Sequence, residues 1–219
     1  MIKINAIIFD MNGVIIDDEK IHEQAFRSVV KEFNYDLTSQ DYKDIFQGKT
    51  DKAGFLAFMK KIHVHDFDLQ MLKQKKIAEY FKLIDNQIES IPGVAELIHK
   101  VSKEYKLALV SSANSQEVEV ILVKLNLKEY FLLVVSGDDV QKGKPDPQPY
   151  IMALRKLGEK PENCIVIEDT STGIKSAKAA GVFCIAITTT HEKKDLIEAD
   201  KIVDNYDQVR EILRKTEKI

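Results

Sequence analysis

The sequence predicts an α/β fold in which a doubly wound, Rossmann-like parallel sheet carries an inserted α-helical cap domain. Three observations predict it. Short apolar runs recur along the 219 residues, stretches with helical periodicity lie between most of them, and one long segment after the first run has no strand pattern. Apolar runs that alternate with helical patterns favour a parallel sheet with helices on both faces. The long interruption marks the place of an insertion.

Five apolar runs are predicted to be strands, with one further candidate. They are rich in β-branched residues and apolar at both odd and even positions, as expected for strands covered on two faces. The runs are Ala6–Phe9, Leu107–Val110, Leu132–Val135, Ile165–Ile167 and Phe183–Ile187, with Lys201–Asp204 as the candidate sixth.

Four segments between these runs have helical periodicity: Gly93–Lys103, Gln116–Leu125, Pro149–Leu157 and Thr172–Ala180. Gly158 and Gly181 stand where the C-terminal caps of two of these helices are expected. Asp169-Thr170-Ser171 offers N-cap side chains to the helix that follows.

The segment from about Asp18 to Asn86 contains no convincing strand. It is predicted to form four helices, at Glu19–Phe33, Ser39–Phe46, Lys52–Ile62 and Asp68–Leu83. Residues 1–17 and 87–219 then form the core domain, and residues 18–86 form the cap domain. Because the insertion begins beside Asp10, we expect the cap to lie above that carboxylate, where it would exclude water and select substrates.

The composition excludes several classes of protein. The net charge is −3 and charged residues make up 31% of the chain, which predicts neither a nucleic-acid partner nor a membrane-surface patch. No apolar run approaches the roughly 18–20 residues that a membrane span needs. Cys164 and Cys184 lie in separate apolar runs, typical of small core residues in a reducing cytoplasm. We expect a cytoplasmic monomer or weak dimer.

Polar residues with chemical potential follow the first two strands. Asp10 ends the first strand and is a candidate nucleophile that would form an acyl-phosphate, although an aspartate in a turn is the simpler alternative. Gly13 would let backbone N–H groups approach a phosphate. Ser111 and Ser112 end the second strand and can bind a phosphoryl oxygen, although Ser111 or Asn114 can equally be a helix N-cap.

The later strand ends carry charged residues. Lys144 stands in a proline-rich turn that can hold its charge against a phosphoryl group, unless the turn is simply solvated. Glu168 and Asp169 end the fourth strand; with Asp10 they form an all-oxygen set suited to Mg²⁺, unless they merely stabilise a helix N-terminus. Because the carboxyl ends of parallel strands meet at one edge of the sheet, we expect these residues to lie together.

These motifs, in this order, resemble those of the haloacid dehalogenase superfamily. Asp10-Met11-Asn12-Gly13-Val14 resembles its first motif, Ser111 the second, Lys144 the third and Glu168-Asp169 the fourth. The inserted helices resemble the cap of the subgroup that contains β-phosphoglucomutase and small-metabolite phosphatases. Ile91-Pro92-Gly93-Val94 resembles the turn by which that subgroup returns to its core. The resemblance covers nearly the whole chain.

The resemblance implies roles for the core residues. Asp10 would attack phosphorus and ligate Mg²⁺, and the residue at Asn12 would offer its backbone carbonyl to the metal. Asp169 would ligate directly, and Glu168 directly or through water. Ser111 and Lys144 would hold the phosphoryl group, and Lys144 would also temper the charge of Asp10.

The resemblance also implies roles in the cap. His22 matches a histidine at the cap hinge of β-phosphoglucomutase-like proteins, although a solvent-facing helix residue is an equal alternative. Gln47-Gly48-Lys49-Thr50 resembles the loop that sets substrate specificity. The mutase has an arginine after that loop which grips a second phosphate, whereas this chain has Asp51. Lys49 or Lys52 can substitute for it, but the change favours a phosphatase.

Asn12 is the main departure from the family pattern, because the second residue of the first motif is normally an aspartate that acts as general acid and base. An amide can neither protonate a leaving oxygen nor accept a proton from water, and such help is worth about 10²- to 10⁴-fold. We therefore expect a site that binds Mg²⁺ and phosphate but turns over slowly. Three explanations remain open: a deliberate Asp→Asn change that traps a complex, a natural asparagine with proton transfer by His22, Asp17 or Asp18, or a phosphate-binding relative without catalysis.

The function expected from the sequence is a Mg²⁺-dependent phosphohydrolase that acts on a small phosphorylated metabolite, a phosphate monoester of the sugar-phosphate type. One alternative is a β-phosphoglucomutase-like phosphosugar mutase, which would need a sugar bisphosphate. The other is a non-catalytic phosphate-binding protein.

Overall fold

Six parallel strands form the centre of the protein. The computed structural model, which describes residues 3–84, 88 and 90–216, arranges them in the order β3-β2-β1-β4-β5-β6. The strands are β1 (Ala6–Phe9), β2 (Lys106–Val110), β3 (Leu133–Val135), β4 (Cys164–Glu168), β5 (Phe183–Ile187) and β6 (Lys201–Val203). The chain winds outwards from β1 to β3 and then returns to β4 on the other side of β1, which confirms the doubly wound sheet.

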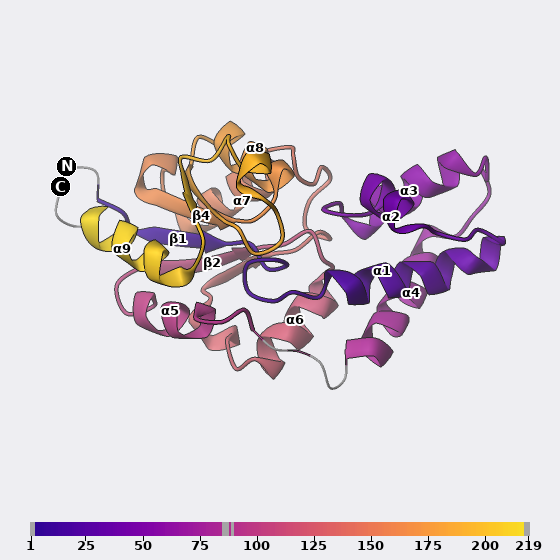
Figure 1. Cartoon of the computed structure of the whole chain (residues 1–219), viewed down its shortest axis with the longest axis horizontal. Helices are drawn as coiled ribbons and strands as arrows, with labels where there is room; N and C mark the ends of the chain where they lie inside the picture. Colours follow the sequence, from indigo (N-terminus) through magenta and orange to yellow (C-terminus); the bar gives the residue numbers. More distant parts are fainter. Residues whose placement is uncertain (1–2, 85–87, 89, 217–219) are drawn as a thin grey trace.

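Helices cover both faces of this sheet, as Figure 1 shows. On one face lie α5 (Val94–Val101), α6 (Ser115–Lys124) and α9 (Tyr206–Thr216), and on the other lie α7 (Gln148–Leu157) and α8 (Ser171–Ala179). Side chains of β1 alternate between two apolar clusters: Ile7 and Phe9 pack against the first group of helices, and Ala6 and Ile8 against the second. Short 3₁₀ turns complete the chain at Lys31–Phe33, Lys128–Tyr130, Pro161–Asn163 and Lys193–Asp195.

The helix α9 was not predicted. Its buried apolar residues are Tyr206, Val209 and Leu213, at a spacing of three and four residues that is typical of one helical face. The remainder of the segment is strongly charged, which obscured the pattern. The hydroxyl of Tyr206 donates to the carbonyl oxygen of Val14, so this helix helps to fix the loop that follows β1.

The predicted helix caps are largely confirmed. Gly158 caps α7 with a left-handed backbone (φ +68°), and Gly181, with φ +79°, follows the C-terminal cap of α8. At the start of α8 the hydroxyl of Thr170 accepts a hydrogen bond from the backbone N–H of Gly173. Gly93 is the N-terminal cap of α5 rather than its first residue.

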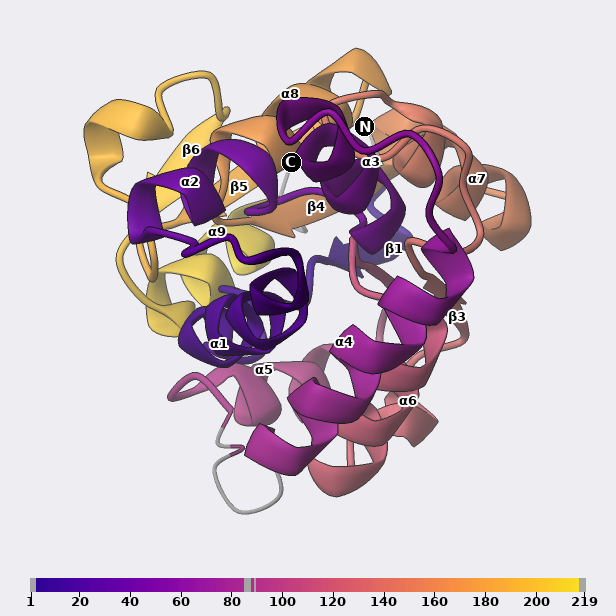
Figure 2. The same ribbon diagram turned by 90° about the vertical axis from the view of Figure 1, so that its right-hand side faces the viewer.

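Four further helices lie beyond one end of the sheet: α1 (Glu19–Val30), α2 (Ser39–Ile45), α3 (Asp51–Lys61) and α4 (Leu69–Ile84). Figure 2, viewed from that end, shows them in front of the strands. Their apolar faces form a cluster of their own, in which Phe26, Phe46, Phe55 and Phe58 pack ring against ring. The predicted helices of the insertion are present, each within one residue at its start. The predicted return to the core between residues 86 and 87 lies outside the described residues.

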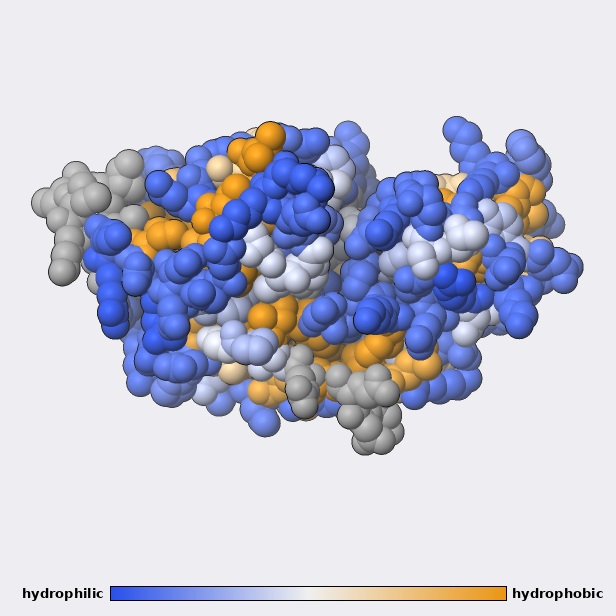
Figure 3. Space-filling model, in the orientation of Figure 1, coloured by the Kyte–Doolittle hydropathy of each residue, from blue (hydrophilic) through white to orange (hydrophobic). Residues whose placement is uncertain are grey.

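The surface is mostly polar on the face drawn in Figure 3, and hydrophobic residues form smaller patches there. Within residues 3–84, 88 and 90–216, no helix combines the length and the apolar character that crossing a bilayer requires.

Candidate active site

The loop after β1 brings its backbone close to a second loop at the same edge of the sheet. Gly13 has a left-handed backbone (φ +79°), and its N–H donates to the carbonyl oxygen of Ile16 at 2.7 Å. A Cβ atom at Gly13 would overlap the carboxylate of Asp169. The sequence therefore needs glycine here both for its conformation and for this close approach.

Lys144 lies between two carboxylates at this edge. Its Nζ is 2.7 Å from Oδ1 of Asp10 and 2.6 Å from Oε1 of Glu168. All three side chains are less than one-tenth exposed, so the lysine compensates charges that water reaches poorly. The predicted proximity of these residues is thus observed.

The oxygens of Glu168 are already used within the protein. Besides Lys144, Oε1 accepts a hydrogen bond from the hydroxyl of Tyr150 at 2.6 Å. The other oxygen, Oε2, faces the backbone N–H groups of Asp169 at 3.1 Å and Thr170 at 3.3 Å. A Cβ atom at Gly173 would overlap this carboxylate. Glu168 is therefore held by the protein more completely than the other two acids.

The three carboxylates have different proton affinities. Burial, followed by the negative charge of Glu168, raises the pKa of Asp10 to about 7, although Lys144 acts in the opposite direction. Burial and the charges of Glu168 and Asp10 raise the pKa of Asp169 well above its usual range. Burial also opposes ionisation of Glu168, but the charge of Lys144 outweighs it and lowers the pKa of Glu168. One lysine thus serves three acids, and Asp10 and Asp169 bind a proton more readily than a free aspartate does.

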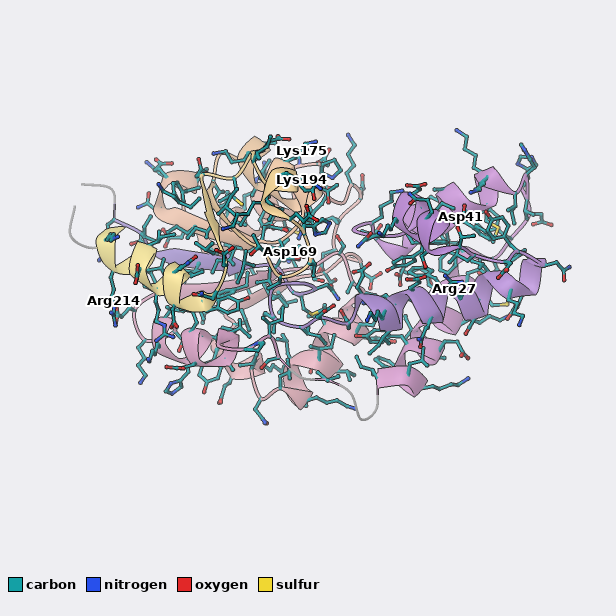
Figure 4. All side chains as sticks on the ribbon, in the orientation of Figure 1. Arg27, Asp41, Asp169, Lys175, Lys194 and Arg214 are labelled. Carbon is teal, nitrogen blue, oxygen red and sulfur yellow. The ribbon has the colours of Figure 1, made fainter. Side chains whose placement is uncertain are left out.

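The residues present fit a hard divalent cation. Asp10, Glu168 and Asp169 each offer a carboxylate oxygen, and these oxygens lie within 4.8 Å of one another. Oδ1 of Asp169 is buried and has no hydrogen-bond partner, while Oδ2 accepts from the hydroxyl of Thr190. An orphaned carboxylate oxygen in an all-oxygen cluster is suited to Mg²⁺. Figure 4 shows Asp169 on the part of the core that faces the cap helices, where Arg27 and Asp41 lie.

Asn12 is surrounded by polar groups from both parts of the chain. Its Nδ2 donates to Oδ1 of Asp18 at 2.7 Å, and its Oδ1 accepts from the hydroxyl of Ser111 at 3.3 Å. Nε2 of His22 lies 3.1 Å from Asp18 and 3.2 Å from the Asn12 amide nitrogen, and its ring stacks on Tyr80. His22 is therefore a buried neighbour of position 12 rather than a solvent-facing residue.

Two of the three residues considered for proton transfer lie beside Asn12. Burial raises the pKa of Asp18, but the His22 ring and the groups that donate hydrogen bonds to Asp18 lower it by more. The net pKa of Asp18 is therefore below its usual range. Burial and the charge of Lys76 lower the pKa of His22, but the Asp18 carboxylate outweighs them and the net pKa is raised. Asp17, in contrast, is exposed.

A cavity lies between this edge of the sheet and the cap helices. Its walls carry Asp10, Asn12 and Lys144 from the core together with an acidic and aromatic set from the cap. The lining residues are Asp10, Asn12, Glu19, His22, Phe26, Tyr42, Phe46, Gln47, Gly48, Lys49, Asp51, Ser112, Ala113, Lys144, Thr170, Thr190 and His191. An opening above the predicted nucleophile is where a substrate would enter.

Some predicted phosphate-binding and cap residues do not line this cavity. Ser112 lines it, whereas Ser111 is buried behind it against Asn12. Gly48 and Lys49 line it, whereas Thr50 is the N-cap of α3, where its hydroxyl accepts from the N–H of Ala53 at 3.2 Å. At the start of α6, Asn114 rather than Ser111 provides the N-cap.

Of the two lysines considered as substitutes for the mutase arginine, one binds backbone carbonyls and the other does not line the cavity. Nζ of Lys49 donates to the carbonyl oxygens of Asp44 at 2.6 Å and Ile45 at 3.0 Å, at the end of α2, and Lys52 is exposed. Asp51 is buried, with one oxygen 3.2 Å from Nζ of Lys76.

Several polar residues in or near the site were not predicted. Thr190 follows β5, and the polar stretch after that predicted strand was an available signal. Tyr150 and Lys76 gave no signal, because each lies within a helical pattern and acquires its carboxylate partner only through tertiary packing.

Comparison with known proteins agrees with the fold and the motifs. The family model of haloacid dehalogenase-like hydrolases matches residues 7–187. A phosphorylated carbohydrates phosphatase of Thermotoga maritima is 33% identical over 200 residues, which cover 90% of this chain and 92% of the relative.

Solved structures show the same architecture. CbbY from Rhodobacter sphaeroides in complex with phosphate has a TM-score of 0.83 and 25% identity, and the match covers 94% of this chain and 96% of CbbY. β-Phosphoglucomutase from Clostridium difficile has a TM-score of 0.85 and 26% identity, with 98% of each chain covered. On its motifs, its fold and these matches, the chain belongs to the haloacid dehalogenase-like hydrolase family.

Proposed function

We propose that this protein is a Mg²⁺-dependent phosphohydrolase that releases phosphate from a small monoester of the sugar-phosphate class, through an aspartyl-phosphate on Asp10. The observation that carries the proposal is the position of Asp10, which lines the cavity while Lys144 holds one of its oxygens at 2.7 Å. The relationship to a phosphorylated carbohydrates phosphatase supports the substrate class.

In this proposal Asp10 is the nucleophile. A carboxylate oxygen of Asp10 forms a bond to phosphorus while the bond between phosphorus and the leaving oxygen breaks, and the leaving oxygen takes a proton from water. Water then attacks the phosphoryl group, releasing phosphate and restoring the Asp10 carboxylate. Lys144 orients Asp10 and offsets the negative charge that approaches with the substrate. Ser112 and the backbone around it offer hydrogen bonds to the phosphoryl oxygens.

The residues that would hold Mg²⁺ are Asp10, Asp169 and the backbone carbonyl of Asn12. Glu168 is better placed to act through water, because its oxygens already accept hydrogen bonds from the protein. When bound, Mg²⁺ neutralises these carboxylates and polarises the phosphoryl group. The unpartnered Oδ1 of Asp169 supports this assignment.

Asn12 makes the proposed enzyme slow. Its amide can donate hydrogen bonds but cannot transfer a proton to the alkoxide or remove one from water. The cost expected for the loss of such a group is about 10²- to 10⁴-fold in turnover.

The mutase alternative receives less support from the cap. A mutase must grip a second phosphate, yet Glu19 and Asp51 line the cap side of the cavity. Among the described residues Lys49 is the only cap lysine in the lining, and its Nζ binds backbone carbonyls of α2. Electrostatics therefore favour a monophosphate.

The proposal retains the cytoplasm as the location and a monomer or weak dimer as the state of the protein. Cys164 and Cys184 are buried free thiols, which fits a reducing compartment.

The experiment is a phosphate-release assay over a panel of hexose, pentose, polyol and glycerol phosphates, with Mg²⁺ or with EDTA. We expect slow release that requires Mg²⁺ and disappears in Asp10→Asn. Asp17→Asn, which changes an exposed aspartate near the same loop, is the matched control and should retain the activity.

Two results would overturn the proposal. The first is release that Asp10→Asn leaves unchanged. The second is absence of release from every ester while Mg²⁺ and inorganic phosphate still raise the melting temperature, which would identify a binding protein.

A further inference from the structure

The side-chain amide of Asn12 points at a buried carboxylate. Its Nδ2 lies 2.7 Å from Oδ1 of Asp18, whose side chain is 1% exposed. Oδ2 of Asp18 accepts from the hydroxyl of Tyr80 and lies 3.1 Å from Nε2 of His22. Both oxygens of Asp18 thus face hydrogen-bond donors, as a buried carboxylate requires.

The two ends of the Asn12 amide are not interchangeable. Oδ1 of Asn12 faces the Ser111 hydroxyl, and the amide nitrogen faces Asp18. Turning the amide over would bring its oxygen against a carboxylate that has no proton to donate. Asp18 therefore fixes the orientation of Asn12.

A carboxylate at position 12 would meet Asp18 unfavourably. It offers two acceptor oxygens and no donor, so one oxygen would face Oδ1 of Asp18 at the distance now spanned by the amide. Two carboxylates this close in a buried site cannot both remain ionised without strong repulsion. A second carboxyl group would keep this contact only by holding a proton, whereas the amide keeps it without one.

We propose that Asp18 is a positioning residue. Its carboxylate accepts a hydrogen bond from an amide at position 12 and disfavours a carboxylate there. Asn12 and Asp18 are then the native arrangement of an amide–carboxylate pair, and a single change at position 12 cannot restore the family's usual aspartate. The catalytic part of this inference rests on the proposed function, whereas the stability part does not.

The exchange Asn12→Asp/Asp18→Asn tests the pair directly. The oxygen of the new amide at position 18 can accept from Tyr80 and His22, and its NH₂ group can donate to the carboxylate at position 12. The hydrogen bonds to Tyr80 and Ser111 and the bond between positions 12 and 18 are retained, and only the last reverses its direction. At position 12 a carboxylate oxygen replaces the amide nitrogen that now lies 3.2 Å from Nε2 of His22. The carboxylate then stands beside Ser111, where the family places its acid and base.

The first measurement is thermal unfolding in EDTA. We expect Asn12→Asp to lower the melting temperature by about 5 °C or more and the exchanged variant to return to within about 2 °C of the wild type. The matched control is Asn205→Asp, at an exposed helix cap where aspartate serves as well as asparagine, and it should change little. A melting temperature for Asn12→Asp equal to that of the wild type would overturn the proposal.

The second measurement is turnover of the best phosphate ester of the panel with Mg²⁺. We expect kcat of the exchanged variant to exceed that of the wild type about 10²-fold with little change in KM, and Asn12→Asp to gain less than about tenfold. A single variant as active as the exchanged one would overturn the proposal. If no variant hydrolyses any ester, the proposed function fails, and the melting temperatures alone decide the pair.

Discussion

Two buried lysines in this protein each lie between two carboxylates, one at the edge of the sheet and one between the cap and the core. Nζ of Lys144 is 2.7 Å from Asp10 and 2.6 Å from Glu168. Nζ of Lys76 is 2.7 Å from Glu117 and 3.2 Å from Asp51.

The surroundings of the two lysines differ. Lys76 is 1% exposed and lies over the rings of Phe26 and Tyr80, at 5.1 and 5.3 Å from their centroids. It joins helices α3 and α4 of the cap to α6 of the core. Lys144 also lies over a ring, that of Tyr150 at 5.3 Å, but unlike Lys76 it lines the cavity.

The charge balance also differs. Each cluster has one unpartnered carboxylate oxygen, Oδ1 of Asp169 and Oε2 of Glu117, but only Lys144 has a third carboxylate, that of Asp169, in its cluster. Beside Lys76, burial and the charge of Asp51 raise the pKa of Glu117, although Lys76 opposes this, so that cluster can approach neutrality by binding a proton. A buried lysine between acids therefore does not by itself mark an active site. The distinguishing features are three carboxylates for one lysine and a lysine that itself lines the cavity.

The largest effect that separates the two clusters is expected from Lys144→Met and Lys76→Met. Either change leaves buried carboxylates without their cation and should reduce the free energy of unfolding by about 3 kcal/mol. Only Lys144→Met should also reduce kcat, by about 10³-fold or more, because it disorders the nucleophile. Phosphate release by folded protein at low temperature measures the change in kcat. Equal losses of activity in both variants would contradict the view that only the Lys144 cluster is catalytic.

Asp169→Asn sharpens the comparison through the metal. Mg²⁺ at about 100 times its dissociation constant stabilises a protein by about 2.7 kcal/mol, or about 5–10 °C at this chain length. We expect the wild type to gain this stability and Asp169→Asn to lose the gain, without a penalty in EDTA, since a repulsive charge has been removed. Asp17→Asn should respond to Mg²⁺ like the wild type; retention of the full shift in Asp169→Asn would place the metal elsewhere.

Gly13→Ala tests how tightly the loop after β1 approaches Asp169. The matched variant is Gly158→Ala, because both glycines have a positive φ but only Gly13 would place its new methyl group against a side chain. We expect a loss of about 1 kcal/mol in Gly158→Ala from backbone strain and about 3 kcal/mol in Gly13→Ala. Chemical denaturation measures both losses of unfolding free energy. Equal losses would show that Asp169 can move away from the new methyl group at little cost.

The smallest effect concerns the pH dependence of the Lys76 cluster. Because burial raises the pKa of Glu117 above its ordinary value of 4.5, the folded protein retains a proton that the unfolded chain releases. The stability contributed by Glu117 is therefore full below pH 4.5 and declines as the pH rises towards the folded pKa. In Glu117→Gln this decline is absent, so its melting temperature relative to the wild type should rise with pH. A difference in melting temperature between Glu117→Gln and the wild type that stays constant from pH 4.5 to 8 would contradict this prediction.

Much of the fold was predictable because the relevant signals are local. Ala6–Phe9 and Phe183–Ile187 are strands with the predicted bounds, since each is an apolar run that the sheet buries on both faces. Asp10, Lys144, Glu168 and Asp169 were predictable as a group because parallel strands bring their carboxyl ends to one edge. The helix α9 was missed because only a few apolar residues stand among many charges.

The remainder of the site depends on contacts that no local pattern encodes. Tyr150 reaches Glu168 only because α7 packs over β2 and β3 and against α8, and Lys76 reaches Glu117 only because α4 approaches α6. The orientation of Asn12 depends on Asp18, six residues later, beyond the loop that follows β1. The sequence therefore predicts which residues end the strands, but not how their side chains are paired.

The most direct test of the account is to trap the phosphoryl group on Asp10. Acetyl phosphate is a suitable substrate, because its acetate leaves without needing a proton. The later attack by water needs a general base, which Asn12 cannot provide, so the phosphorylated form should accumulate. Wild-type protein with Mg²⁺ and acetyl phosphate, quenched in acid and digested, should yield a peptide phosphorylated at Asp10, and EDTA should prevent it. In the Asn12→Asp/Asp18→Asn variant the same species should decay faster. Phosphorylation at another residue, or none while phosphate is released, would contradict the central role of Asp10.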